Sequence, residues 1–228
     1  MLEQRLAQLA DMVEPGSRVA DIGTDHAYLP IALVKDEKVN FAIASDVAAG
    51  PLNNAINDIK MAGLEGKIIT RLGSGLETLK PEDKIDTIII AGMGGKLMRD
   101  LLDKPAQENN FYENLILEPN VGEPIVRKWL MDHSYKIEAE KIIEVSGHIY
   151  ELIKAKWVKD LVNLSTAQIQ FGPFLLKEKN NIFIKKWSKQ LDFQKNLLSN
   201  LQKAKQQDAN KIEATKKIIA MIEEILHD

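Results

Sequence analysis

Two acidic residues and a histidine surround the first glycine that follows an apolar run. Residues 20–26 read Ala-Asp-Ile-Gly-Thr-Asp-His, which places carboxylates at Asp21 and Asp25 on either side of Gly23. A glycine directly after a buried strand lets the backbone approach a ligand closely, and a following helix offers free N–H groups. The GxGxxG spacing of a dinucleotide site is missing, and the two carboxylates would repel a pyrophosphate. The turn favours a ligand with an ammonium group and no phosphates, such as S-adenosylmethionine; an ordinary capped strand–helix turn is the alternative.

Two further turns carry residue types that suit an adenosine. Asp46 follows the second predicted strand, where an acidic side chain can accept hydrogen bonds from both ribose hydroxyls. Gly73 and Ser74 begin the Gly-Ser-Gly turn after the third predicted strand, where an adenine could stack against bare backbone. Each turn alone is also typical of a helix N-cap or an ordinary loop. Their order after successive strands predicts an adenosine-type cofactor.

A third glycine turn, residues 91–95, reads Ala-Gly-Met-Gly-Gly. Its glycines imply close backbone approach by cofactor or substrate, or else close helix–strand packing. Many amino-methylating enzymes carry an Asp/Asn-Pro-Pro-aromatic tetrad at this place, and this sequence does not, which disfavours methylation of an exocyclic amine. A ring nitrogen with its own lone pair needs mainly alignment with the methyl group and exclusion of water.

The segment 117–120, Leu-Glu-Pro-Asn, places a carboxylate and an amide at the same predicted rim. Asn120 could hydrogen-bond an adenine edge; a strand-end cap at Glu118 and a turn residue at Asn120 are the alternatives. His26, next to Asp25, is a candidate for substrate contact or proton handling. The other three histidines lack metal-ligand spacing, so no metal site is predicted.

Strand-like and helical segments alternate along the first part of the chain, and this order must position the turns. Repeated strand–helix units force a mostly parallel sheet with helices on both faces, and ligands bind beyond the carboxyl ends of such strands. The fold class predicted is therefore α/β and Rossmann-like. The expected strands are 17–22, 41–45, 67–72, 85–91, 115–118 and a hairpin of 135–145 with 148–158; the expected helices are 2–13, 27–35, 51–62, 94–102 and 123–132.

The last part of the chain is rich in Lys, Gln, Asn and Leu and reads as helix, which predicts two domains, 1–160 and 161–228. Two heptad patterns suggest an antiparallel coiled-coil hairpin with a break at 206–210, where Asp208 is a plausible N-cap. This appendage is either a packing or dimerisation arm or a substrate clamp. The first heptad runs from about Pro173 to Lys205 through Ile184, Trp187, Leu191, Gln194, Leu198 and Leu201; the second contains Ile212, Thr215, Ile219, Ile222 and Leu226.

Composition narrows the class of protein. The 228 residues include no cysteine, which excludes a disulfide framework, a thiolate zinc site and a cysteine nucleophile. No long apolar run and no signal-peptide layout are present, so a cytoplasmic protein without a membrane partner is expected. The net charge of −3 combines −7 for residues 1–160 with +4 for residues 161–228. The acidic part suits a cationic sulfonium cofactor, and the basic part suits phosphate.

Three segments together resemble the bacterial TrmK family of S-adenosylmethionine-dependent tRNA methyltransferases, which modify N1 of adenine 22. They are residues 20–30, 90–95 and 117–120, and the resemblance covers essentially the whole chain. It implies a class I methyltransferase domain with a C-terminal coiled-coil hairpin. Position by position, it implies that the cofactor turn is lined by Asp21, Gly23, Asp25 and His26, the ribose is bound by Asp46, the adenine side is formed by Gly73 and Ser74, and the reaction centre is edged by Gly92 and Met93.

The reaction implied by the resemblance is direct in-line attack of adenine N1 on the sulfonium methyl group. N1 lies on the Watson–Crick edge, so the target base must be unpaired or flipped out. Asp25, His26 and Asn120 are the candidates for catalytic roles, and no motif identifies a general base. Phosphates of the tRNA would be contacted by basic residues, namely Arg5, Arg18, Lys96, Arg99, Arg127, Lys128 and the lysines of the C-terminal helices.

Other functions stay open at this point. A methyltransferase could act on another RNA, a protein or a small molecule. A nicotinamide oxidoreductase is disfavoured by the missing GxGxxG motif. A non-catalytic RNA-binding protein would use only the helical arm. A monomer is expected.

Overall fold

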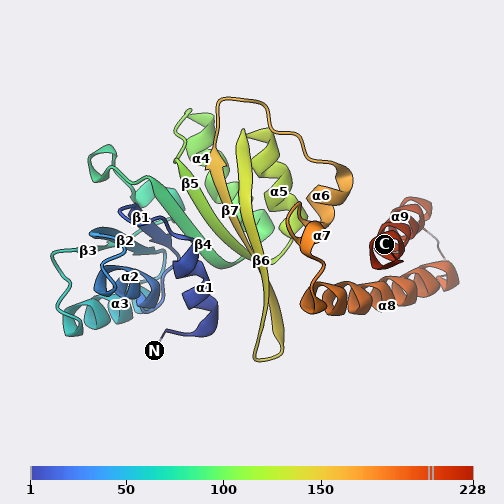
Figure 1. Cartoon of the computed structure of the whole chain (residues 1–228), viewed down its shortest axis with the longest axis horizontal. Coiled ribbons are helices and arrows are strands. Elements are labelled where there is room, and N and C mark those ends of the chain that lie inside the picture. The colour runs from blue at the N-terminus through green and yellow to red at the C-terminus, as the bar shows by residue number, and fades with distance from the viewer. Residues whose placement is uncertain (1, 205, 207, 228) are drawn as a thin grey trace.

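The computed structural model describes residues 2–204, 206 and 208–227. Its centre is a seven-stranded sheet in the order β3-β2-β1-β4-β5-β7-β6 (Figure 1). The first five strands are parallel, and β7 is antiparallel to both neighbours. The order reverses at β1, which lies between β2 and β4. The strands are β1 (Arg18–Ile22), β2 (Phe41–Asp46), β3 (Ile68–Leu72), β4 (Thr87–Gly94), β5 (Asn114–Val121), β6 (Tyr135–Val145) and β7 (His148–Trp157).

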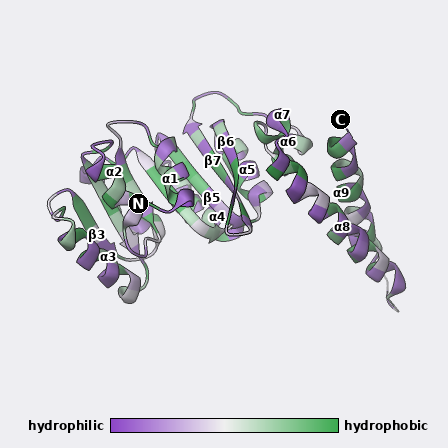
Figure 2. Ribbon diagram, turned by 60° about the horizontal axis from the view of Figure 1, so that its bottom comes forward, coloured by the Kyte–Doolittle hydropathy of each residue, from purple (hydrophilic) through white to green (hydrophobic). Residues whose placement is uncertain are grey.

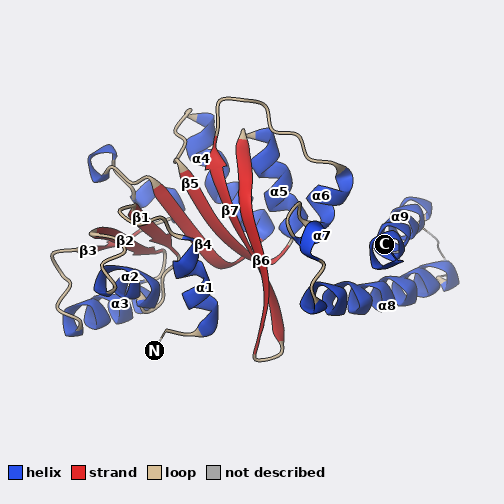
Figure 3. Cartoon of the chain, in the orientation of Figure 1, coloured by secondary structure: helices blue, strands red, loops and turns tan. Residues whose placement is uncertain are grey.

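Helices cover both faces of this sheet (Figure 3). Ile89 of β4 packs in the cluster formed with α1, α2 and α3, whereas Ile88 and Ile90 pack with α4 and α5. Successive side chains of a strand point to opposite faces, so one apolar strand supplies both cores. The predicted α/β class is confirmed. The helices are α1 (Gln4–Met12), α2 (Tyr28–Lys35), α3 (Ala49–Met61), α4 (Gly95–Gln107) and α5 (Glu123–Asp132), with short 3₁₀ turns η1 (Gly75–Thr78) and η2 (Pro81–Asp83).

The hairpin predicted near the end of the sheet is present. Val145 of β6 pairs with His148 of β7, and Ser146 and Gly147 form the turn with φ of 51° and 82°. Two consecutive residues with positive φ suit the two-residue turn that matches the twist of antiparallel strands. The hairpin closes the sheet at the side from which the C-terminal helices project.

Four helices follow the sheet, α6 (Thr166–Phe171), α7 (Leu175–Glu178), α8 (Asn181–Lys203) and α9 (Ala209–His227). The pair α8 and α9, called the arm below, packs as a helical hairpin beside the sheet domain (Figure 1). The carboxylate of Asp208 accepts the backbone N–H of Lys211 at 3.0 Å, which confirms the predicted N-cap of α9. Two positions of the predicted break and heptad, 205 and 207, lie outside the described residues.

Burial in the arm corrects part of the first heptad. Ile184 is exposed, and its neighbour Phe183 is buried together with Trp187. The reason is that the first turns of α8 pack on Phe171 and Leu175 of α6 and α7, whereas the heptad assumed that α9 was the partner. Figure 2 shows the central strands as largely hydrophobic, while the arm helices mix hydrophobic and hydrophilic residues. In α9 Thr215, Ile219 and Ile222 of the second heptad are buried, whereas in the last turn Ile225 is buried and the predicted Leu226 is only partly so.

None of the helices within residues 2–204, 206 and 208–227 is long and apolar enough to cross a membrane. The boundary at residue 160 stays a prediction. Helices α6 and α7 contact α5 and β6 of the sheet domain, so the chain beyond residue 160 first packs on that domain and only then enters the arm.

Candidate active site

The turns after β1, β2 and β3 are joined by backbone hydrogen bonds at the carboxyl edge of the sheet. The N–H groups of Gly23 and Thr24 donate to the carbonyl of Ser45 at 2.8 and 3.0 Å, and the N–H of Gly73 donates to the carbonyl of Asp46 at 3.0 Å. Three motifs separated in the sequence therefore lie along one edge, where the strand order reverses. Crevices at such a point are the usual ligand sites of open parallel sheets.

Asp21, near the end of β1, is buried, with 9% of its surface exposed. Burial raises the pKa of its carboxyl to about 6, against opposing effects of a hydrogen bond with Thr24 and the charge of Arg5; the charge of Asp46 raises it further. Asp25 lies nearby with its side chain 69% exposed. Two carboxylates in this position produce a negative potential that suits a cationic ligand.

A pocket of about 260 Å³ opens beside this turn. Gly23 has φ of +82°, and a Cβ built on it would lie 2.2 Å from Cε of Met93, so a side chain at this position would need Met93 to move. The glycine thus keeps β1 and the glycine turn of β4 in contact. The pocket is lined by Glu3, Arg5, Leu6, Asp21, Gly23, Thr24, Asp25, His26, Ala27, Tyr28, Leu29 and Ala91.

His26 is held from two sides. Its Nδ1 lies 2.8 Å from Oδ2 of Asp58 on α3, its Nε2 lies 3.8 Å from Asp25, and its ring stacks on Tyr28 with centroids 4.8 Å apart. The side chain is 35% exposed and lines the pocket. Because Asp58 orients the ring, the histidine has a fixed position from which it can contact a bound ligand.

Asp46 and the Gly73–Ser74 turn lie at the ends of β2 and β3, beside the pocket rather than among its lining residues. Oδ1 of Asp46 accepts the N–H of Ala48 at 2.7 Å, which holds the carboxylate at the start of α3. A Cβ on Gly73 would lie 2.7 Å from Cγ2 of Thr78. The structure therefore gathers Asp21, Gly23, Asp25 and His26 in one pocket and places Asp46, Gly73 and Ser74 along the adjoining edge.

The glycine turn 92–95 is fixed by the turn after β5. Nδ2 of Asn120 donates to the carbonyl of Gly92 at 2.6 Å. A Cβ on Gly95 would lie 2.3 Å from the carbonyl oxygen of Gly122, so these two backbones touch. Strand β4 continues through this turn to Gly94, beyond the predicted end at 91, with a shifted register against β5. Asn120 thus supports the wall of the site formed by Gly92 and Met93.

Arg5 and Glu118 form a pair at this site, whereas the sequence predicted Arg5 as a phosphate contact and Glu118 as a separate rim residue. Arg5 of α1 pairs with Glu118 of β5 and lies over the ring of Tyr150. Glu118 is fully buried, and burial raises the pKa of its carboxyl against the charge of Arg5. Its Oε1 has no hydrogen-bond partner among the described residues. The Leu-Glu-Pro-Asn motif marked Glu118 as a rim residue, but no sequence signal placed α1 over it.

One basic residue predicted to contact phosphate cannot do so. Arg127 is fully buried on α5 and is bonded to Glu140 and Glu151, so the expectation that it contacts tRNA is wrong. It faces the sheet because α5 packs its inner side on β6 and β7. No group of three or more His, Cys, Asp or Glu side chains within the described ranges could hold a metal ion.

Comparisons with known proteins all find similarity to one family of tRNA methyltransferases. A family model described as tRNA (adenine(22)-N(1))-methyltransferase matches residues 19–224. The Bacillus subtilis (strain 168) tRNA (adenine(22)-N(1))-methyltransferase is 36% identical over 215 residues, which cover 92% of this chain and 90% of that protein.

Solved structures extend the similarity to the whole chain, arm included. The Streptococcus pneumoniae protein Sp1610 in complex with S-adenosyl-L-methionine has a TM-score of 0.90 at 36% identity, covering 100% of both chains. M. capricolum TrmK in complex with S-adenosyl-homocysteine has a TM-score of 0.88 at 31% identity, covering 100% of this chain and 98% of that one.

Proposed function

The chain belongs to the TrmK family of tRNA (adenine(22)-N(1))-methyltransferases, and from this membership we propose how its residues bind the cofactor and present the adenine. The protein is an S-adenosylmethionine-dependent enzyme that methylates N1 of adenine 22 in tRNA. The observation that carries the residue assignment is the acidic pocket at the end of β1, in which Asp21 is buried.

The pocket fits S-adenosylmethionine by its chemistry. The cofactor carries a sulfonium and an ammonium group, and Asp21 and Asp25 supply negative charge at the pocket without an intervening phosphate site. Gly23 leaves the backbone bare where a side chain would meet Met93. We assign the methionine moiety to the turn with Asp21, Gly23, Asp25 and His26.

The adenosine moiety is assigned to the adjoining edge. Asp46 stands at the end of β2, where a carboxylate accepts hydrogen bonds from ribose hydroxyls. Gly73 and Ser74, at the end of β3, offer a surface of backbone for the adenine ring. The reactive end then falls beside Gly92 and Met93, and the closeness of the Met93 side chain to Gly23 supports this assignment.

The chemical step needs no dedicated general base. Bound S-adenosylmethionine supplies a methyl group that is already activated for transfer. Adenine N1 carries its own lone pair, so no proton has to leave before it attacks, and alignment and exclusion of water supply most of the acceleration. The methylated ring is cationic, and the carboxylate of Asp25 stabilises that charge. We place Asn120 and His26 as contacts that orient the unpaired or flipped-out base.

The arm is proposed to bind the tRNA backbone. Residues 161–228 carry a net charge of +4, and lysines are exposed on both arm helices, among them Lys189, Lys216 and Lys217. Phosphate contacts of this kind fix the register of a nucleic acid without reading its sequence. We further propose that the enzyme is cytoplasmic and that it is a monomer. Sedimentation of the free protein tests the oligomeric state.

Methylation of a tRNA transcript by the purified protein tests the assignment of substrate and atom. Incubation with labelled S-adenosylmethionine, followed by mass spectrometry of the nucleosides, should give 1-methyladenosine at position 22. A transcript with guanine at position 22 is the matched control and should remain unmethylated. Binding of tRNA without formation of S-adenosyl-homocysteine would favour a non-catalytic RNA-binding protein, and methylation only of protein or small molecules would favour the other methyltransferase classes.

A further inference from the structure

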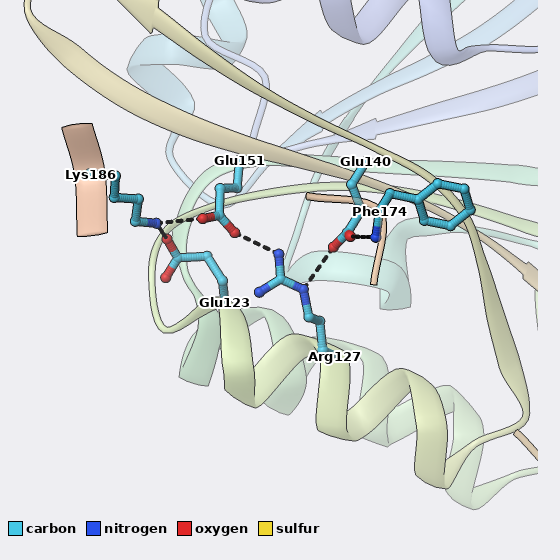
Figure 4. Close-up of polar contacts among 6 residues, drawn as sticks. All are labelled: Glu123, Arg127, Glu140, Glu151, Phe174 and Lys186. Atoms are coloured by element: carbon cyan, nitrogen blue, oxygen red, sulfur yellow. Dashed lines mark hydrogen bonds and ion pairs between the residues drawn. The ribbon is translucent and has the colours of Figure 1, made fainter. Parts of the chain in front are cut away.

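A cluster of charged side chains is buried where the arm meets the sheet domain (Figure 4). We call it the arm joint; its members are Glu123, Arg127, Glu140, Glu151 and Lys186. They come from α5, β6, β7 and α8, and Figure 4 shows their side chains pointing toward one another. None of them has a role in the site described above.

Arg127 is the centre of the joint. Its Nε donates to Oε1 of Glu140 at 2.7 Å, and its Nη2 donates to Oε2 of Glu151 at 2.6 Å. All three side chains are at most 1% exposed. Planar, two-sided binding of this kind fixes direction as well as distance, because the N–H bonds of a guanidinium diverge at fixed angles.

Lys186 connects the arm to this centre. Its Nζ donates to Oε1 of Glu151 at 2.7 Å and pairs also with Glu123. Lys186 is on the second turn of α8, next to Trp187, which is buried against Phe171 with ring centroids 4.6 Å apart in an edge-to-face arrangement. The aromatic contact supplies apolar contact area, whereas the ammonium group lies between the carboxylates of Glu123 on α5 and Glu151 on β7 and so ties α8 to both elements.

The segment that leads into the arm is held by the same cluster. The N–H of Phe174 donates to Oε2 of Glu140 at 2.9 Å. Gly172 has φ of +89°, and a Cβ on it would lie 2.6 Å from that same oxygen and 2.7 Å from Nη2 of Arg127. The backbone between α6 and α7 therefore lies directly on the buried ion pair, and the path of the chain into α8 is fixed.

The other side of the joint leads to the reaction centre. Glu123 is the first residue of α5, and Gly122, its N-cap, touches Gly95 of the glycine turn. Asn120 of the same segment donates to the carbonyl of Gly92. A short series of direct contacts thus runs from Lys186 of the arm to the turn that edges the reaction centre.

We propose that Lys186 is a positioning residue that sets the direction of the arm relative to the Gly92–Gly95 turn. A tRNA held along the arm is then presented with its adenine at the methyl group. This inference rests on the proposed binding of tRNA by the arm. It goes beyond that function because it assigns the alignment of substrate and reaction centre to one partly buried ammonium group.

The direction of the arm can be measured without tRNA. The chain has no cysteine, so spin labels at Lys60→Cys on α3 and Asn196→Cys on α8, both exposed positions, report one distance across the joint. We expect a narrow distance distribution for the parent protein and a broadened or shifted one for Lys186→Met. Lys189→Met, one turn further along α8 at an exposed position, is the matched control and should leave the distribution unchanged.

A conservative variant separates positioning from bulk packing. Lys186 borders a cavity of about 160 Å³, so the larger guanidinium of Lys186→Arg has room and should restore the narrow distribution. Glu123→Gln is a milder alternative if Lys186→Met does not fold, because Lys186 keeps Glu151. It should broaden the distribution in the same direction, but less.

Kinetics with tRNA complete the test. Lys186→Met should lower kcat/KM for tRNA by about 10- to 100-fold, the size expected for a misplaced reactant, while its affinity for S-adenosylmethionine stays unchanged. Lys186→Arg should recover most of the loss. An unchanged distance distribution would overturn the proposal. So would a changed distribution with an unchanged kcat/KM. If the parent protein does not methylate tRNA, the proposed function fails, and the distance measurement still reports on the joint.

Discussion

The proposed cofactor pocket and the arm joint both hold buried carboxylates, but the fold gives them different partners. At the pocket, Asp21 is buried with a hydrogen bond to Thr24 and forms no ion pair within the described residues. In the joint, Glu140 and Glu151 are each bonded to Arg127, and Glu151 also to Lys186.

This difference separates two uses of buried charge. Charge left without a partner raises the free energy of the protein alone and is compensated when a cation binds, so it favours ligand binding. Charge that is paired with opposite charge offers less to a ligand, and its hydrogen bonds instead tie together the elements that carry it. The unpaired acid of the pocket therefore favours binding of a cationic ligand, whereas the ion pairs of the joint fix how the elements around them are oriented.

The largest effect is expected from breaking the joint. Arg127→Met leaves Glu140 buried without a cation and Glu151 with Lys186 alone, which should lower the free energy of unfolding by about 3–5 kcal/mol. Urea denaturation measures it. Lys128→Met is the matched control, because Lys128 forms an exposed pair with Asp132 on the same helix and should cost at most about 1 kcal/mol. Equal losses for both variants would remove the distinction between the joint and an ordinary surface pair.

At the pocket, the raised pKa of Asp21 predicts that the free energy of unfolding falls as pH rises. The pKa of Asp21, raised by burial from 3.8 to about 6, lies above its value in the unfolded chain. Folding therefore favours protonated Asp21, and the associated stability is complete below about pH 4 and is lost as pH rises through 6. The loss amounts to about 3 kcal/mol. Relative to the parent protein, Asp21→Asn should gain stability by up to that amount between pH 4 and 7 in parallel unfolding curves.

Cofactor binding should follow the same titration. A cationic cofactor binds ionised Asp21, so affinity should rise with pH up to about 6 and then level off. Calorimetry on Asp21→Asn should show weaker binding without this rise. Asp192→Asn, an exposed position on α8, serves as control. A pH rise that persists in Asp21→Asn would assign the titration to another group.

A smaller effect is expected at Asp46. Asp46→Ala should weaken cofactor binding by about 1–3 kcal/mol, the size of a lost charge-assisted hydrogen bond, and leave tRNA affinity unchanged. Asp46→Asn keeps an acceptor for the N–H of Ala48 and should preserve the turn while losing the charge. Unchanged calorimetric affinity in both variants would remove Asp46 from the site.

The smallest effect should come from the exposed lysines of the arm, in contrast to the partly buried Lys186. Replacing Lys189, Lys216 and Lys217 together by alanine should weaken tRNA binding and reduce the slope of log K against log salt by about 2. Filter binding at several salt concentrations measures it, with cofactor affinity as the internal control. An unchanged slope would make the arm a packing element without phosphate contacts.

Much of the architecture was readable from the sequence because its signals are local. Apolar strands such as 85–91, a hairpin turn at Ser146 and Gly147, and a capping residue at Asp208 each specify an element within a few residues. The regular order of strands and helices then leaves few topologies, and the glycine and acidic turns necessarily meet at one edge of a parallel sheet. The heptad prediction was wrong at Ile184, because the first turns of α8 pack on α6 and α7, whereas the heptad assumed α9 as the partner.

The sequence by itself determined the α/β class, the acidic turn after the first strand and the family, because these depend on residue types at short spacing. Only the tertiary structure decided which distant charges meet. Arg5 reaches Glu118 across 113 residues, and Lys186 reaches Glu151 across 35. No local pattern encodes such pairs, because their partners are chosen by how helices pack on the sheet. For the same reason Arg127, which reads as an ordinary surface cation, is the buried centre of the joint.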